Sequence, residues 1–285
     1  MAFLRLRDVS VDFPIYQAGS RSLKKLLLAS STRGNLGRDA RHRINVRALS
    51  DVTFEIGDGE RFAVIGRNGA GKTTLLKVLA GIYEPTRGRF TASGKISSLL
   101  DVQVGLNLDA TGRENIVLRG MYMGIHPSEM RERAAEVAEF TELGDYLDMP
   151  VRTYSAGMMV RLAFAASTCV PPDILIMDEW LTAGDTQFLK KAQRRVEAFV
   201  RTSSILVLAS HSLELVEQWC NRGILLQQGL VVAIGPIQEI IAAYRAASDA
   251  GAAEDCDPDL ALAGVPQGIE TVDAASPLAA DAEEP

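Results

Sequence analysis

The chain has 285 residues, enough for one large domain or two modest ones, and its composition, 47% hydrophobic and 23% charged, is ordinary for a soluble globular protein. No apolar run approaches the ~20 residues that a membrane-spanning helix needs, and the N-terminus lacks the apolar core of a signal peptide. The three cysteines have no close spacing, which excludes a disulfide framework or a cysteine metal site. We expect a protein of the reducing cytosol that another protein must hold at any membrane where it works.

The formal net charge of −6 is unevenly distributed along the chain. Residues 246–285 contain ten acidic residues and no Lys or Arg, so the remainder carries a net positive charge. This tail is rich in Ala, Asp, Glu and Pro, has no aromatic residue, and shows no sustained periodicity, a composition typical of disorder. We predict a folded domain over residues 1–245 and a disordered acidic tail over 246–285.

The N-terminal part begins as strand and is then interrupted. Alternating residues predict a strand over 3–7, and the segment 9–16 adds two aromatic residues, Phe13 and Tyr16, that are candidates for stacking on a nucleobase. Residues 17–47 follow, with eight basic residues and one acid. Within them, 20–30 predicts a short amphipathic helix that needs a surface to pack on, because about three turns are marginal alone; the rest is predicted to be loop.

A glycine-rich loop at residues 66–73, GRNGAGKT, dominates the next part of the sequence. It fits G-x-x-x-x-G-K-[ST], the loop that wraps nucleotide phosphates, and it stands between a predicted strand over 61–65 and a predicted helix over 73–79. Its glycines let the backbone adopt positive φ and bring N–H groups to phosphate oxygens, next to a helix N-terminus. Lys72 is expected to reach the β- and γ-phosphates, and Thr73 to bind Mg²⁺. The expected contacts with ATP here are Gly66, Asn68, Gly69, Gly71, Lys72, Thr73 and Thr74.

Strands and helices alternate through the remaining chain. A strand over 52–56 precedes the loop region and a turn over 81–88 follows it. Further strands are predicted over 95–100, 174–177 and 205–209, and one on each side of 228–229. Helices are predicted over 112–124, 128–143, 155–170 and 186–201, and two more begin at 212 and at 236. This alternation favours an α/β fold with a largely parallel sheet.

Two carboxylates end the apolar strand at 174–177. In open α/β sheets, ligands bind at the carboxyl ends of strands, so Asp178 and Glu179 should face the phosphate loop. Asp178 is expected to coordinate Mg²⁺, directly or through water. Glu179 is expected to orient and deprotonate the water that attacks the γ-phosphate.

The segment 154–158, YSAGM, with Arg161, resembles the signature L-S-G-G-Q-x-x-R of ATP-binding-cassette (ABC) ATPases, and it stands shortly before the acidic strand, as in that family. Ser155 and Gly157 are retained although two other positions differ, and with the dipole of the following helix they would form an anion site. In the family, this site contacts the γ-phosphate of ATP held by the opposing subunit. The resemblance therefore implies a head-to-tail homodimer with two ATP molecules between the subunits.

The same resemblance implies the fold and further site residues. The fold would be α/β, a phosphate-loop NTPase nucleotide-binding domain with a mixed central sheet, a small antiparallel β subdomain and a helical subdomain over 112–170. His211 matches the family's switch histidine, which touches the γ-phosphate, and Asp185 lies at the position of its inter-subunit aspartate loop. For adenine stacking, the family's Val-Ser-x-x-aromatic spacing favours Phe13 over Tyr16.

Segments 99–107, 109–116 and 180–185 resemble a subgroup of ABC ATPases that export lipid-linked O-antigen, capsular polysaccharide or teichoic acid. Most ABC proteins place a glutamine after the strand that here ends at Leu100, where it contacts Mg²⁺ and the membrane subunit. Asp101 occupies that position in this chain, with Gln103 as a rival. The subgroup also carries an extra helix near the transporter's cytoplasmic mouth, which the basic insert over 17–47 would match.

These resemblances imply a dimeric ATPase, with ATP and Mg²⁺ as cofactors, that energises a separate integral membrane permease for lipid-linked polysaccharide at the cytoplasmic face of the inner membrane. One alternative is the ATPase of a drug or small-molecule exporter. A soluble ABC ATPase acting on nucleic acid is less favoured, since such proteins typically have two cassettes or a long coiled-coil insertion, so we expect no nucleic-acid partner. Because a β-sandwich needs ~100 residues, the acidic tail is not expected to form a glycan-binding domain.

Overall fold

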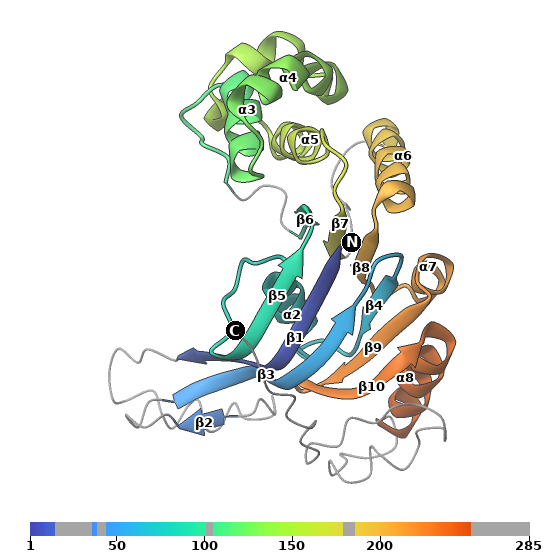
Figure 1. Cartoon of the computed structure of the whole chain (residues 1–285). Coiled ribbons are helices and arrows are strands. Elements are labelled where there is room, and N and C mark those ends of the chain that lie inside the picture. The colour runs from blue at the N-terminus through green and yellow to red at the C-terminus, as the bar shows by residue number, and fades with distance from the viewer. Residues whose placement is uncertain (15–35, 39–43, 101–104, 179–185, 252–285) are drawn as a thin grey trace.

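The structure is a computed structural model of the chain and describes residues 1–14, 36–38, 44–100, 105–178 and 186–251. The described part consists of a four-stranded antiparallel sheet, a six-stranded mixed sheet, and a group of helices that stands apart from both sheets at one end of the molecule (Figure 1). This confirms the predicted α/β fold with a mixed central sheet, a small antiparallel β subdomain and a helical subdomain. The predicted helix over 20–30 lies outside the described residues.

The antiparallel sheet has the strand order β2-β3-β1-β5. Its strands are β1 (Phe3–Pro14), β2 (Leu36–Arg38), β3 (Ile44–Ile56) and β5 (Arg87–Ser93). In β1 the apolar residues alternate inward, so that Leu4 and Leu6 are buried, and so are Val9 and Val11 after a register shift. One face of this sheet thereby becomes a wall of the hydrophobic core.

Several strand boundaries predicted for this region were wrong. The segments 3–7 and 9–16 form one strand, because a β-bulge and a positive φ of 50° at Asp8 let the inward alternation restart. Part of the stretch predicted as loop is strand, since β2 pairs with β3 and β3 already begins at Ile44. Strand β5 was missed because all its side chains except Phe90 are exposed, which leaves no apolar alternation to detect.

The mixed sheet has the strand order β10-β9-β4-β8-β7-β6. Its strands are β4 (Arg61–Ile65), β6 (Ile96–Leu99), β7 (Ile174–Asp178), β8 (Ile205–Ala209), β9 (Arg222–Gln227) and β10 (Leu230–Pro236). Neighbouring strands are parallel except β10, which runs antiparallel to β9. The central strands β4, β7 and β8 are apolar except for Arg61 and Asp178 at their ends, because both faces of the sheet are covered.

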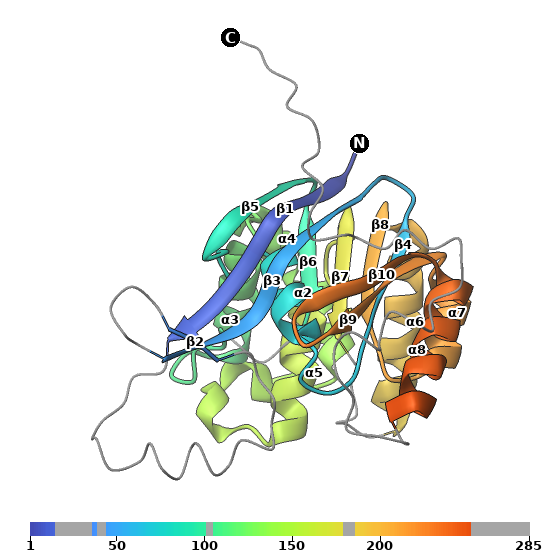
Figure 2. The ribbon, with the colours of Figure 1, turned by 90° about the horizontal axis from the view of Figure 1, so that it is seen from below.

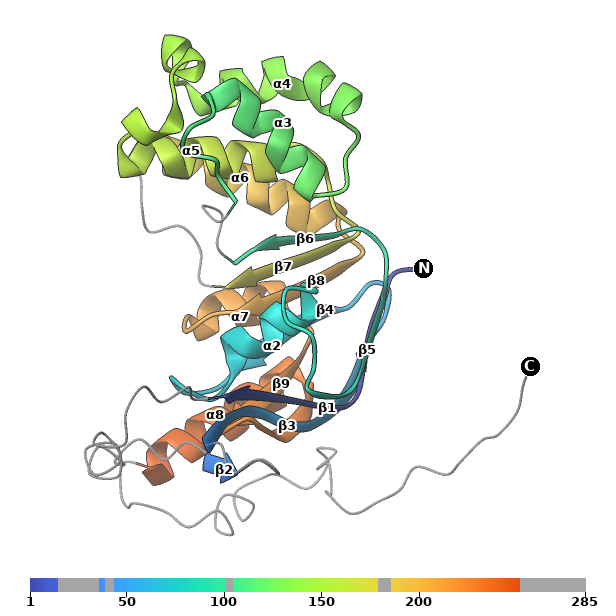
Figure 3. The same cartoon turned by 90° about the vertical axis from the view of Figure 1, so that its left-hand side faces the viewer.

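Two hydrophobic cores lie on the two faces of the mixed sheet. On one face, side chains such as Val64 and Val207 pack with α2 (Lys72–Leu79), which lies between the two sheets (Figure 3). On the other face, side chains such as Leu208 pack with α7 (Leu213–Trp219) and α8 (Ile237–Gly251) (Figure 2). Helix α8 runs six residues past the boundary predicted at 245, so the predicted tail begins as helix; residues 252–285 lie outside the described part. Pro236, predicted to start this helix, instead ends β10.

The helical subdomain contains α3 (Gly112–Tyr122), α4 (Pro127–Thr141) and α5 (Ala156–Ser167), with short 3₁₀ turns at Gly144–Asp148 and Val151–Thr153. Local sequence explains where the helices begin: a capping box joins Thr111 and Glu114, proline stands at the start of α4, and Ser155 caps α5. The three helices were predicted to within a few residues. None of the helices in the described ranges is long and apolar enough to cross a bilayer.

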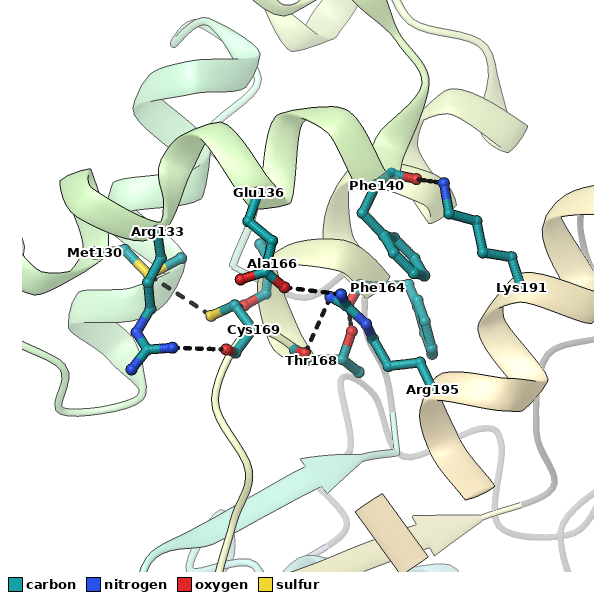
Figure 4. A network of polar contacts seen from close by, with 10 residues as sticks. All are labelled: Met130, Arg133, Glu136, Phe140, Phe164, Ala166, Thr168, Cys169, Lys191 and Arg195. Atoms are coloured by element: carbon teal, nitrogen blue, oxygen red, sulfur yellow. Dashed lines mark hydrogen bonds and ion pairs between the residues drawn. The ribbon is translucent and has the colours of Figure 1, made fainter. Parts of the chain in front are cut away.

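Helix α6 (Thr186–Thr202) is attached to the helical subdomain through its basic side chains. The Arg195 guanidinium carbon lies 4.0 Å from the centroid of the Phe140 ring, and its two terminal nitrogens donate to Glu136 at 2.9 Å and to the Thr168 carbonyl at 3.3 Å (Figure 4). One turn earlier, Lys191 donates to the Phe140 carbonyl at 3.2 Å. These contacts join α6 to α4 and to the end of α5.

Candidate functional site

The phosphate loop, residues 66–73, connects β4 to α2, as the motif requires. Gly69 and Gly71 have φ values of 81° and 105°, in the left-handed region that favours glycine. A Cβ at Gly71 would also lie only 2.7 Å from the Ala48 carbonyl oxygen of β3. The loop is therefore packed against the antiparallel sheet, and the sheet fixes its position.

Lys72, near the end of the loop, is the first residue of α2 and is buried. Its Nζ donates to the Gly66 carbonyl at 2.8 Å and to the Arg67 carbonyl at 3.2 Å. The ammonium group is thus held beside the loop's backbone N–H groups and the start of α2. This arrangement concentrates positive charge where phosphate oxygens would bind.

A hydroxyl and a carboxylate meet beside the loop. Thr73 Oγ1 donates to Asp178 Oδ2 at 3.0 Å across a separation of 105 residues. Asp178 ends β7, whose neighbour β8 leads to His211. Hydroxyl and carboxylate oxygens are ligands that Mg²⁺ prefers, and Mg²⁺ usually takes only one or two protein ligands together with substrate phosphates. This pair therefore fits a magnesium ion, and among the described residues no larger cluster of metal-ligating side chains was found.

A cavity of about 490 Å³ opens over the loop, a size within the usual range for small-molecule sites. Most residues predicted as nucleotide contacts line it: Asn68, Gly69, Gly71, Lys72, Thr73, Thr74, Asp178 and His211. Gly66 does not line it but supplies the carbonyl that accepts from Lys72. Five residues that the sequence reasoning missed complete the lining: Val46, Arg47, Ala48, Leu100 and Gln228.

Four of the missed residues, all except Leu100, come from segments that carry no nucleotide-binding motif. Val46, Arg47 and Ala48 belong to β3, in the stretch where the sequence predicted loop or no element. Gln228 is at the tip of the hairpin between β9 and β10, with φ of 51°. Arg47 is hydrogen-bonded to Asp12, which together with the carboxylate's charge raises the pKa of its guanidinium above the usual value. No pattern along the sequence indicates that these two segments approach the loop.

Phe13, the expected adenine-stacking residue, is not among the residues that line the cavity. Its ring makes an edge contact with Tyr83, with 5.5 Å between the centroids, and it is 37% exposed. The adenine role of Phe13 stays a prediction. Tyr16, its rival, lies outside the described residues.

Ser155 and Gly157 are not part of this cavity. They stand at the N-terminus of α5, where the Ser155 hydroxyl accepts from the Met158 N–H at 3.3 Å. Ser155 is exposed, and a Cβ at Gly157 would meet nothing closer than 3.9 Å. The signature segment is therefore accessible to another molecule. Glu179, Asp185, Asp101 and Gln103 lie outside the described residues.

Known proteins resemble this chain in sequence and in fold. The family described as ABC transporter matches residues 49–182. The chain is 38% identical over 231 residues to the O-antigen export system ATP-binding protein RfbE of Yersinia enterocolitica, covering 81% of this chain and 97% of that protein. It is 44% identical over 210 residues to the O-antigen export system ATP-binding protein RfbB of Myxococcus xanthus, covering 74% of this chain and 48% of that protein, so it spans about half of that relative's length.

Among solved structures, the chain is similar in fold to the dimeric ATP-binding cassette MJ0796 in a post-hydrolysis state bound to ADP and Pi. The TM-score is 0.57 at 20% sequence identity, and the match covers 82% of this chain and 98% of that one. Identity above 30% over nearly the whole length of the Yersinia relative shows the relationship: the chain belongs to the family of ABC transporter ATP-binding proteins.

Proposed function

We propose that this chain is the ATP-hydrolysing subunit of an ABC exporter that moves lipid-linked polysaccharide across the cytoplasmic membrane through a separate permease. The observation that carries the ATPase part is the cavity in which the phosphate loop, Asp178 and His211 meet. Parallel strands end at this cavity, and α2 begins there, so positive backbone groups and a carboxylate converge on one place.

The phosphate loop holds the triphosphate. N–H groups of the loop and of the first turn of α2 donate to phosphate oxygens, and Lys72 exchanges its carbonyl partners for the β- and γ-phosphates. Thr73 and Asp178 would hold Mg²⁺, and the 3.0 Å distance between Thr73 Oγ1 and Asp178 Oδ2 supports a shared ligand. A bound ion would neutralise charge on the β- and γ-phosphates.

Hydrolysis requires a positioned water. Glu179 follows Asp178 directly in the sequence and acts as the general base that takes the water's proton. His211 lines the cavity from the segment after β8 and contacts the γ-phosphate. The role of Asp101, with Gln103 as its rival, is to link this end of the nucleotide to the permease.

Two copies of the chain complete two sites. The accessible start of α5, with Ser155 and Gly157, binds the γ-phosphate of ATP held by the other copy through its N–H groups and helix dipole. The dimeric cassette to which the fold is similar supports this arrangement. ATP then joins the two copies, and its hydrolysis lets them separate.

The transported substrate is inferred from the relatives. Two similar proteins are named as ATP-binding proteins of O-antigen export systems. We infer that this chain binds a membrane permease, lies at the cytoplasmic face of the inner membrane, and energises export of an O-antigen-like polysaccharide carried on a lipid.

Replacing Glu179 with Gln tests the proposal. The variant should bind ATP but lose hydrolysis by about a hundredfold or more, because the base is gone while the phosphate contacts remain. It should accumulate as an ATP-bound dimer in size-exclusion chromatography. In cells it should stop export and leave the lipid-linked polysaccharide on the cytoplasmic side.

Glu217→Gln is the matched control, since Glu217 is an exposed glutamate on α7. It should keep wild-type hydrolysis. An ATP-bound Glu179→Gln monomer would contradict the dimeric site, and normal hydrolysis would contradict the role of Glu179. Intact polysaccharide export in such cells would exclude the assigned cargo while leaving the ATPase assignment standing.

A further inference from the structure

Helices α4, α5 and α6 meet at a cluster of three aromatic rings, one from each helix. Phe140, Phe164 and Phe188 are buried, and their ring centroids lie 5.9 or 6.0 Å apart in every pair. The rings of Phe140 and Phe164 can be followed in Figure 4. Because each ring contacts the other two, a shift of one helix disturbs the packing of all three.

A carboxylate beside this cluster joins the same three helices. Glu142, at the C-terminal end of α4, accepts a hydrogen bond from Lys191 Nζ of α6 at 2.7 Å and pairs with Arg161 Nη1 of α5 at 3.8 Å. The two cations also lie over the rings, Lys191 Nζ at 4.7 Å from the Phe140 centroid and Arg161 Cζ at 5.2 Å from the Phe188 centroid. Glu142, Lys191 and Arg161 thus form an ionic clamp across the three helices.

Glu142 has a backbone conformation that disfavours a side chain. Its φ is 57° and its ψ is 30°, in the left-handed region where glycine is favoured. The hydrogen bond from Lys191 holds the pKa of its carboxyl below the usual value, so the group is ionised at neutral pH. Backbone strain of this kind persists where surrounding contacts over-determine it. Here those contacts are the two cations of the ionic clamp.

The ionic clamp connects two segments that the proposed function assigns to different ATP molecules. Helix α5 begins after Ser155, in the signature segment that would reach the ATP of the other copy, and Arg161 lies in its second turn. Only residues 179–185, which include Glu179, separate α6 from the end of β7 at the nucleotide cavity. The helix of the signature segment is therefore joined to the helix that follows the general base.

We propose that Glu142 is a positioning residue for ATP hydrolysis, which fixes the orientation of the signature helix relative to the segment that carries the general base. It acts through Lys191 and Arg161 and not on the nucleotide, since it is not among the residues that line the cavity. The phosphate contacts within one subunit come from the loop and α2, so the ionic clamp affects the site shared by two copies and not the binding of ATP to one. This inference rests on the proposed function.

The first test measures ATP hydrolysis by two variants that remove the ionic clamp in different ways. Glu142→Gly deletes the carboxylate and suits the left-handed backbone. Lys191→Met deletes the ammonium group but keeps an apolar chain over Phe140. Each should lower kcat about tenfold, because a small displacement of a group that acts on the reacting atoms is costly. The affinity of the single subunit for ATP, measured by isothermal titration calorimetry with EDTA to prevent hydrolysis, should stay within about twofold of wild type.

The second test measures dimer formation in the Glu179→Gln background. The subunit concentration at which half of the protein is an ATP-bound dimer should rise about tenfold when Glu142→Gly or Lys191→Met is added. A variant with both changes should be no less active than either single variant, because both break the same interaction. Lys191→Arg keeps the charge and should retain most of the hydrolysis. Glu139→Gln is the matched control, since Glu139 is an exposed glutamate one turn earlier on α4, and it should behave like wild type.

Three outcomes would overturn the inference. They are a normal kcat in both Glu142→Gly and Lys191→Met, a loss of single-subunit ATP affinity as large as the loss of kcat, or additive losses in the variant with both changes. Lys191→Met, which keeps the packing over the ring, decides the result if the glycine weakens folding. Absence of an ATP-bound dimer in Glu179→Gln alone would contradict the proposed function, and the role of Glu142 in a shared site would fall with it.

Discussion

Gly71 illustrates how a single residue can be constrained twice. Its φ of 105° is unfavourable for residues with a Cβ, and the space that a Cβ would need is taken by the Ala48 carbonyl and the Leu49 side chain. The sequence motif predicts the first constraint, because the loop must turn its N–H groups inward. Only the packed structure adds the second.

The buried thiol of Cys220 makes the stability of the protein depend on pH. Burial raises the pKa of its thiol to about 12, whereas an unfolded cysteine titrates near 8.5. The unfolded chain therefore loses this proton first, and stability falls as the pH rises from about 8.5 toward 12. Between pH 7.5 and 9.5 this thiol should reduce the free energy of unfolding by about 1.4 kcal/mol.

Urea unfolding of wild type and Cys220→Ala at both pH values measures that contribution. The variant loses packing at each pH. Its free energy of unfolding should nevertheless decrease less than that of wild type between pH 7.5 and pH 9.5, by about 1.4 kcal/mol. An equal decrease in the two proteins would mean that the buried thiol does not contribute. All other titrating groups contribute equally to the decrease in both proteins, so their contributions cancel when the two decreases are subtracted.

At the scale of elements, helix α6 is more closely joined to the helical subdomain than its sequence suggests. Its order in the chain, after β7 and before β8, predicts a helix that only covers the sheet. Instead, Arg195 lies over the Phe140 ring and bonds to Glu136 and Thr168, so the helix also supports α4 and α5 (Figure 4).

Replacing Arg195 with Ala should therefore destabilise the protein. Losing a cation–π contact and two charged hydrogen bonds is expected to cost about 2 kcal/mol, which lowers Tm by roughly 4–8 °C for a domain of this size. Differential scanning calorimetry measures the shift. Arg194→Ala is the matched control, since Arg194 is the exposed neighbour on the same helix, and it should change stability by less than about 0.5 kcal/mol. Equal shifts in the two variants would show that the network of Arg195 adds no stability.

At the scale of the whole molecule, the proposed sites are shared between two copies, and this makes a complementation experiment informative. Lys72→Ala damages the phosphate loop, and Ser155→Glu places a negative charge where the partner's γ-phosphate would bind. Each variant alone should be inactive. In a heterodimer, both lesions fall in one site, and the other site is intact.

Mixing equal amounts of the two inactive proteins should thus restore ATPase activity. Random pairing gives heterodimers in half of the population, each with one working site of two, so about a quarter of wild-type activity is expected if the sites act independently. Differently tagged subunits verify that heterodimers have formed. Heterodimers without any activity would contradict sites composed from both copies.

Local sequence was sufficient for one half of the candidate site. The strand, the loop at 66–73 and the helix after it are adjacent in the chain, and their geometry follows from glycine φ and apolar periodicity within a short window. The position of Asp178 near the loop was also predictable, because the carboxyl ends of parallel strands lie at the same edge of the sheet. The 3.0 Å contact between Thr73 and Asp178 agrees with that expectation.

The part of the cavity that β3 lines follows only from packing between distant segments. Arg47 reaches the cavity because the register of β1 and β3 sets it against Asp12, and that register depends on bulges that no periodic pattern reveals. Strand β5 could not be predicted because nearly all its side chains are exposed, and the contact of Phe13 with Tyr83 joins residues 70 positions apart in the chain. Elements and motifs whose interactions span a few residues can be predicted from the sequence. Which distant strands meet, and which side chains they bring to the cavity, depends on packing between segments far apart in the chain.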